Sequence, residues 1–248
     1  MDVDAYLHRI GYLGPLEPNL DTLRALHRAH LRAVPFENLD IPLGRPIVLD
    51  EARLFEKVIQ RRRGGFCYEL NGLFAALLRE LGFDVQRLSA RVATAAGGFG
   101  IEKDHMALRV QLEEGWLADV GFGEGFLEPL RLDERGEQAR GEGHYRLEGE
   151  GDSLTYLRWS AGAWKADYVV SLRPYTLEEF DVGCRYHQTS PESPFTRWRV
   201  CTRPTPEGRI TLSDMKLVLT TAGERREQLL EDEAAYQAAL REHFGIVL

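Results

Sequence analysis

The sequence predicts an α+β protein in which helices come first, strands follow, and both are mixed at the end. Apolar residues recur at helical spacing up to about residue 82. Beyond Gly82 they fall in short runs separated by polar and glycine-containing turns, which is typical of strands. With 248 residues, 44% of them hydrophobic, and no low-complexity linker, the chain can bury a substantial core as one packed body.

Four helices are expected in the first third, over residues 4–12, 20–33, 51–60 and 67–81. Asn19 and Asp50 can cap the second and third of these, and Pro35 stops the second. The fourth has the strongest helical periodicity, with apolar residues at 70, 73, 74, 77, 78 and 81. Gly82 follows it, where a left-handed cap is expected.

The middle of the chain predicts strands over residues 87–92, 106–112, 116–120, 145–147, 154–159 and 164–170. A glycine-rich loop over residues 94–100 separates the first two. The last part predicts a helical turn at 177–181, strands at 198–202, 209–212 and 216–220, and a closing helix over 231–244.

The charge balance excludes several classes of function. The chain carries 31 basic and 39 acidic residues, a formal charge of -8, which argues against a nucleic-acid partner. No stretch approaches the length of an apolar membrane span, and no signal peptide is evident at the start. The three cysteines form no metal or dithiol motif, so no metal is expected. We therefore expect a cytoplasmic protein.

The segment 62–71 is the most informative part of the sequence because it places Cys67 at the probable first turn of a helix, just after Gly64 and Gly65. A helix N-terminus carries roughly half a positive charge, which favours a thiolate. This predicts a nucleophilic cysteine with a lowered pKa. The two glycines allow backbone to approach a ligand, or free N–H groups to stabilise an oxyanion; the plain alternative is a loop-to-helix turn.

Two downstream segments supply partners for a cysteine nucleophile. His105 begins one expected strand and Asp119 ends the next, and a tight turn at residues 113–115 joins the two. On an antiparallel pair the two side chains are then close to cross-strand neighbours. An imidazole can take the thiol proton, and a carboxylate on its other nitrogen fixes the tautomer. The sequence therefore predicts a Cys67–His105–Asp119 acyl-transfer site.

Other candidate groups have simpler interpretations. Cys184 and Cys201 are expected to be small core residues. His27 and His30 lie on one helix face and are expected to be structural, and Glu37 and Asn38 either hydrogen-bond the cysteine loop or shape a turn.

Five segments in order make the chain resemble the arylamine N-acetyltransferase family of bacterial type. They are residues 9–12 (RIGY), 35–39 (PFENL), 63–71 (RGGFCYELN), 105–108 (HMAL) and 119–123 (DVGFG). The resemblance covers nearly the whole chain. It implies a helical bundle over 1–83 carrying Cys67, a β-barrel-like domain over 84–190 carrying His105 and Asp119, and an α/β lid over 191–248. The site, of the cysteine-protease-like Cys-His-Asp type, would lie between the first two.

The resemblance also implies a double-displacement reaction. Acetyl-CoA, as co-substrate, would acetylate Cys67, and an arylamine, arylhydrazine or N-hydroxyarylamine would then accept the acetyl group. The residues implied to line the substrate cleft are Phe122, Gly123, Gly98, Phe99 and Phe195. The partners are therefore CoA and a small-molecule amine, and the chain would be a monomer or a homodimer.

Three alternatives remain open at this point. An amide synthase of the same fold would use a longer or carrier-bound acyl donor with the same triad. A cysteine hydrolase would share the Cys-His-Asp order and consume acyl-CoA without an amine. A binding module with a vestigial site is disfavoured because all three triad residues are present.

Overall fold

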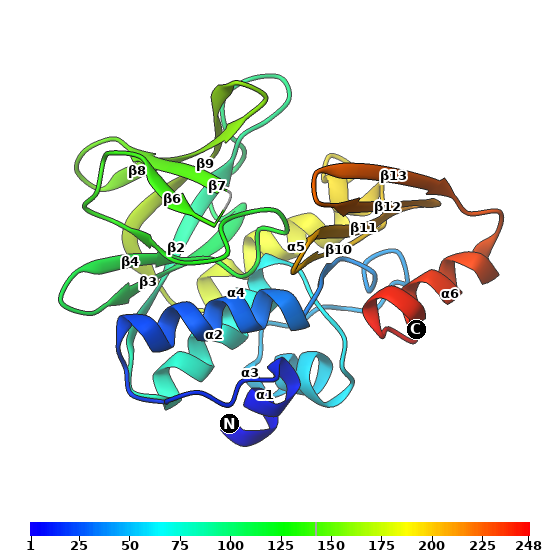
Figure 1. Cartoon of the computed structure of the whole chain (residues 1–248), viewed down its shortest axis with the longest axis horizontal. Coiled ribbons are helices and arrows are strands. Elements are labelled where there is room, and N and C mark those ends of the chain that lie inside the picture. The colour runs from blue at the N-terminus through cyan, green and yellow to red at the C-terminus, as the bar shows by residue number, and fades with distance from the viewer. Residues whose placement is uncertain (142) are drawn as a thin grey trace.

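The computed structural model describes residues 1–141 and 143–248. The helices of the first part are α1 (Val3–Ile10), α2 (Leu20–Ala33), α3 (Glu51–Phe55), the π-helical turn η1 (Glu56–Gln60) and α4 (Cys67–Glu80). The side chain of Asn19 caps α2 and that of Asp50 caps α3, as the sequence predicts. In Figure 1 α4 passes behind α2, and the rings of His27 and His30 on α2 contact that of Phe74 on α4.

An eight-stranded antiparallel sheet follows the helices. In sequence its strands are β2 (Asp84–Val92), β3 (His105–Gln111), β4 (Gly115–Ala118), β5 (Leu130–Arg131), β6 (Gln138–Arg140), β7 (Gly143–Glu148), β8 (Ser153–Ser160) and β9 (Ala163–Tyr175). Their spatial order is β5-β4-β3-β2-β9-β8-β7-β6. The side chain of Gln138 in β6 exchanges two hydrogen bonds with the backbone of Arg131 in β5, at 2.8 and 3.0 Å, so the two edges meet. The sheet is therefore barrel-like, as expected.

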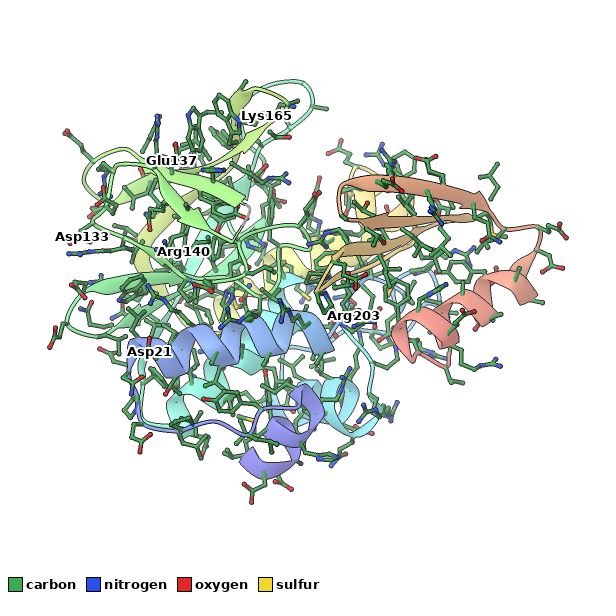
Figure 2. The ribbon with its side chains drawn as sticks, in the orientation of Figure 1. Asp21, Asp133, Glu137, Arg140, Lys165 and Arg203 are labelled. Carbon is green, nitrogen blue, oxygen red and sulfur yellow. The ribbon has the colours of Figure 1, made fainter. Side chains whose placement is uncertain are left out.

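A second sheet of five strands forms the last part, with the order β1-β10-β11-β12-β13. Its strands are β1 (Phe36–Glu37), β10 (Val200–Thr205), β11 (Gly208–Ser213), β12 (Lys216–Thr221) and β13 (Glu224–Leu229), and α6 (Glu233–Phe244) packs on it. Because β1 comes from the helical part, this sheet joins the two ends of the chain. Arg203, labelled in Figure 2, strengthens the junction by donating to the carbonyl oxygens of Arg32 and His243.

Between the two sheets, the turn η2 (Glu178–Phe180), helix α5 (Asp181–Thr189) and the turn η3 (Pro194–Thr196) complete the chain. Helix α4 is buried over twelve residues and packs against β2 and β3 of the barrel-like sheet. Figure 1 shows the barrel-like sheet at the upper left, the five-stranded sheet at the upper right, α5 between them and α1, α2 and α3 below. The first residue of α4 therefore lies where all three parts meet. The domain boundaries at 83 and 190 remain predictions.

The fold class is confirmed, and individual elements differ from their expected extents. The helix expected over 51–60 changes to a π-helical turn at Glu56, and α5 extends the expected turn at 177–181 by two helical turns. Strand β13 was not expected, because all six of its residues are exposed and its sequence shows no alternation of apolar and polar residues. The structure identifies it as a strand through its pairing with β12.

Candidate active site

The sequence-predicted histidine and aspartate meet in the structure. His105 is the first residue of β3 and Asp119 directly follows β4, and the ladder pairs Leu108 with Ala118. The next pair outward would set Asp119 opposite residue 107, two residues from His105. The Nε2 atom of His105 lies 2.7 Å from Oδ2 of Asp119, and both side chains are buried. The contact places the carboxylate on one imidazole nitrogen and leaves Nδ1 as the nitrogen available for a proton.

Asp119 is held by hydrogen bonds that the sequence did not predict. Its Oδ1 accepts from Nδ2 of Asn71 at 2.9 Å and from the backbone N–H of Gly121 at 3.0 Å. Burial acts to raise the pKa of Asp119, but His105 and these hydrogen bonds lower the pKa below its ordinary value. The carboxylate therefore stays ionised and directly contacts His105, a side chain that can carry a positive charge.

Asn71 ties the helix of the nucleophile to the two strands of the other triad residues. Besides Asp119, it donates to the carbonyl oxygen of Met106 at 2.6 Å and accepts from the N–H of Val120 at 2.9 Å. Asn71 lies on α4 one helical turn beyond Cys67. Its amide therefore fixes the start of this helix to the segments that carry His105 and Asp119. A polar residue within an otherwise apolar helix face was the only sequence signal for this role.

Cys67 is the first residue of α4 and is 3% exposed. Burial raises the pKa of its thiol well above the usual range, while a backbone hydrogen bond from Met106 acts to lower it. Burial thus opposes the lowered pKa that the sequence predicts for this thiol. A thiolate at Cys67 would be stabilised as an ion pair by an imidazolium at His105, which lines the same cavity.

The glycines around Cys67 serve close packing. A Cβ atom on Gly121 would lie 2.7 Å from Cα of Cys67, so the strand end and the helix start touch through backbone. A Cβ on Gly64 would lie 2.0 Å from the carbonyl oxygen of Pro35, and one on Gly65 would lie 2.8 Å from Glu69. The expectation that Gly64 and Gly65 leave room for a ligand is therefore wrong, because protein atoms fill that space.

The N–H groups just before Cys67 are also occupied. That of Gly65 donates to Pro35 and that of Phe66 donates to Oε2 of Glu69 at 3.1 Å. The expectation that free N–H groups of this turn face an oxyanion is wrong at these two positions. Their hydrogen bonds fix the entry into α4 instead.

Five charged side chains form a buried ion-pair cluster behind this turn. They are Glu37, Asp40, Lys57, Arg63 and Glu69. Nζ of Lys57 lies 2.7 Å from Asp40 and 2.8 Å from Glu69, and Arg63 donates to Glu37 at 2.8 Å. Burial acts to lower the pKa of Lys57, but the three carboxylates raise it above its ordinary value, so the ammonium stays charged.

A cavity of about 600 Å³ opens beside the triad. Its wall includes Cys67 and His105, together with Phe36, Phe122 and Phe195. The end of β2 and the loop before β3 complete this part of the wall, with residues 92–95, 100 and 101. Phe122 and Phe195 therefore lie in the wall, as the resemblance implied. Gly98, Phe99 and Gly123 are not among its lining residues. Gly123 instead packs against Phe36, and its carbonyl accepts from Arg209.

In the described part of the chain, no group of three or more His, Cys, Asp or Glu side chains is arranged to hold a metal ion. Among the helices in residues 1–141 and 143–248, none combines the length and the apolar character needed to cross a membrane.

Comparisons with known proteins show the family and the fold of this chain. Residues 19–248 match the N-acetyltransferase family model. The arylamine N-acetyltransferase of Escherichia coli K12 is 37% identical over 97% of this chain and 87% of its own length. The solved structure of the Salmonella typhimurium arylamine N-acetyltransferase superposes with a TM-score of 0.94 at 34% identity, covering 98% of this chain and 90% of that one. The Mycobacterium marinum arylamine N-acetyltransferase in complex with CoA gives 0.92 at 36% identity, over 99% and 93%.

Proposed function

The chain belongs to the arylamine N-acetyltransferase family, and on that premise we propose that Cys67, His105 and Asp119 carry acetyl transfer from acetyl-CoA to an amine. The protein is an N-acetyltransferase acting on arylamines, with acetyl-CoA as co-substrate. The observation that carries the residue assignment is the 2.7 Å contact between His105 and Asp119, in a structure where His105 and Cys67 line one cavity.

In the first half-reaction Nδ1 of His105 takes the proton of the Cys67 thiol. The thiolate attacks the acetyl carbon of acetyl-CoA, the bond from that carbon to the CoA sulfur breaks, and CoA leaves as its thiol with the proton from His105. Asp119 keeps Nε2 of His105 bound and stabilises the imidazolium that forms between these steps. The product is an acetyl thioester on Cys67.

In the second half-reaction the amine nitrogen attacks the thioester carbon. Nδ1 of His105 removes a proton from that nitrogen and returns it to the sulfur of Cys67 as the thioester bond breaks. An aromatic acceptor suits the cavity because Phe36, Phe122 and Phe195 form apolar wall around the thiol. Arylhydrazines and N-hydroxyarylamines offer the same aromatic body with a nucleophilic nitrogen or oxygen. Gly98, Phe99 and Gly123 stay as proposed substrate contacts.

The size of the cavity supports one second candidate. About 600 Å³ exceeds the room that an acetyl group and a single aromatic ring need, so a longer or carrier-bound acyl donor is the competing donor for the same triad. Such an amide synthase would form the same thioester at Cys67.

The test is intact-protein mass spectrometry after addition of acetyl-CoA alone, beside a Cys67→Ala control. We expect one acetyl group on the wild type, none on Cys67→Ala, and its removal when an arylamine is added. An adduct from a longer acyl-CoA but not from acetyl-CoA would favour the amide synthase. Free CoA released without any amine would favour a hydrolase.

Cys67, Cys184 and Cys201 are all unpaired in the structure. Because the reaction needs the Cys67 thiol, we propose that the protein works in a reducing compartment such as the cytoplasm. The protein would act as a monomer or as a homodimer.

A further inference from the structure

His27 is a buried histidine on α2 whose two ring nitrogens both bind the segment that follows β4. The backbone N–H of Asp119 donates to its Nε2 at 3.0 Å, and its Nδ1 lies 3.0 Å from the carbonyl oxygen of Leu127. The side chain is completely buried. A residue 92 positions away in sequence thus holds the backbone of the triad carboxylate.

These two partners fix the protonation state of the ring. A peptide N–H only donates and a carbonyl oxygen only accepts, so His27 is neutral, with its proton on Nδ1. Burial, the main cause, lowers the pKa of His27 to about 4, although the hydrogen bonds and the charge of Asp119 act to raise it. At neutral pH His27 therefore adds no positive charge that would compete with His105 for Asp119.

The two bonds of His27 bracket one functional segment, residues 119–127. The segment begins with Asp119 and contains Gly121 and Phe122, which line the cavity. The ring of His27 stacks on that of Phe126, with centroids 5.7 Å apart and planes at 14°. One residue further along, Arg28 pairs with Glu128 at 2.8 Å. Two consecutive residues of α2 therefore contact the segment at its ends.

His30 shows what a buried histidine on the same helix looks like without that role. It is also completely buried, and its ring lies 5.4 Å from that of Phe74, a residue that His27 contacts as well. Its Nδ1 is bonded by the hydroxyl of Tyr6 at 2.7 Å, and its Nε2 has no hydrogen-bond partner among the described residues. It makes no hydrogen bond to residues 119–127.

We propose that His27 is a positioning residue for the reaction: it binds both ends of residues 119–127 so that the Asp119 carboxylate faces His105 and Phe122 stays in the cavity wall. The inference rests on the proposed function of the triad. It assigns to α2 a part in catalysis that the helical sequence pattern alone does not indicate, and it separates His27 from His30, which only packs the core.

The test compares His27→Leu, His27→Gln and the matched control His30→Leu. Leucine removes the acceptor for the Asp119 N–H, whereas the amide oxygen of glutamine reaches the position of Nε2 and restores it. We measure kcat with acetyl-CoA and an arylamine, and the pH profile of Cys67 alkylation by iodoacetamide. For His27→Leu we expect kcat to fall on the order of a hundredfold, the effect of a catalytic group misplaced by about 1 Å, together with a shifted alkylation profile.

His27→Gln should recover most of kcat and the wild-type profile. His30→Leu should lower the thermal midpoint but leave kcat of the folded enzyme and the profile unchanged. If His27→Leu keeps both readouts, or if both leucine variants lose them equally, the proposal is overturned.

Should His27→Leu fail to fold, His27→Asn provides the same contrast, because its shorter amide can reach Leu127 but not the Asp119 N–H. Equal kcat for the asparagine and glutamine variants would then overturn the proposal. Failure of the proposed function itself has a different signature, since wild-type protein would then form no acetyl adduct at Cys67.

Discussion

Two buried polar clusters meet at the N-terminal end of α4, and they are built on opposite principles. The triad cluster, formed by His27, Asn71, His105 and Asp119, contains a single permanent charge and is held by directional hydrogen bonds. The ion-pair cluster, formed by Glu37, Asp40, Lys57, Arg63 and Glu69, sets three carboxylates against two cations. Each includes a residue of the first turns of α4, Asn71 or Glu69, yet only the first includes a residue that lines the cavity, His105.

The difference shows how one helix end is both fixed and kept reactive. In the ion-pair cluster every charged side chain contacts at least one of opposite charge, so the turn before Cys67 is anchored and no proton needs to move. In the triad cluster no permanent cation neutralises Asp119, so its charge is available to His105 when that ring takes a proton. Had Lys57 been placed beside Asp119, the imidazolium would lose the partner that stabilises it.

The largest effect should come from Asp119→Asn. The new amide nitrogen would face Nε2 of His105 and donate to it, so the ring proton moves to Nδ1, the nitrogen that must accept the thiol proton. We expect kcat to fall by about 10⁴, as for the equivalent change in other triads, while the thermal midpoint changes little. Steady-state kinetics and calorimetry measure the two. A variant with full activity would contradict the role given to Asp119. So would a variant that no longer folds, because the loss of activity would then have a structural cause.

Lys57→Met should have the reverse effect of Asp119→Asn: it should lower stability and leave kcat nearly unchanged. It leaves Asp40 and Glu69 without their common cation in a buried site, and breaking a buried ion pair costs about 3–5 kcal/mol of unfolding free energy. Urea unfolding measures this loss. The kcat of the folded fraction should stay close to wild type, because Lys57 does not line the cavity. A variant as stable as the wild type, but inactive, would show that the two clusters are not separate.

The pH dependence of stability should reveal the neutral histidines. Their pKa values in the folded protein are lowered from 6.5 to about 4 for His27 and about 3 for His30, in both cases mainly by burial. The unfolded chain therefore binds more protons between those values and 6.5. The contribution of the two histidines to the free energy of unfolding is complete above pH 6.5. It falls as the pH drops toward 4, by about 1.4 kcal/mol per pH unit for each histidine. Urea unfolding of His27→Gln should show the slope of one histidine fewer, and an unchanged slope would contradict a neutral His27.

The smallest change in stability should come from removing an exposed ion pair near the same turn. Arg61 pairs with Glu56, and both side chains are solvent-exposed, at 68% and 48%. Arg61→Met should change the unfolding free energy by less than about 1 kcal/mol, because exposed pairs contribute little. A loss as large as that of Lys57→Met would mean that charge near the turn, rather than burial of the cluster, determines stability.

The sequence predicted the triad because each member lies in a short local motif. Cys67 starts a strongly periodic helix, and His105 and Asp119 flank a hairpin whose turn length fixes their spacing. Asn71 and His27 escaped prediction in their roles, because they act across 48 and 92 residues through packing that no local pattern encodes. The same holds for the ion-pair cluster, of which the sequence singled out only Glu37, as a possible hydrogen-bond partner of the cysteine loop.

The glycines before Cys67 show the opposite failure. Gly64 and Gly65 have the sequence pattern of a ligand-facing turn, but the space in front of them is filled by Pro35 and Glu69. Whether a glycine faces ligand or protein depends on what the rest of the chain places there. Among the elements, β13 was invisible because an exposed edge strand needs no apolar face.

The central claim is that His105 makes a thiolate of Cys67 although burial opposes it. The most direct test is the rate of iodoacetamide alkylation of Cys67 between pH 4 and 10, followed by peptide mass spectrometry with Cys184 and Cys201 as internal references. We predict that Cys67 reacts fast already below neutral pH in the wild type, that both references stay slow, and that Asp119→Asn abolishes the early reactivity. If Cys67 instead reacts only at alkaline pH, at the rate of the other two cysteines, burial controls the thiol and the ion-pair account is contradicted.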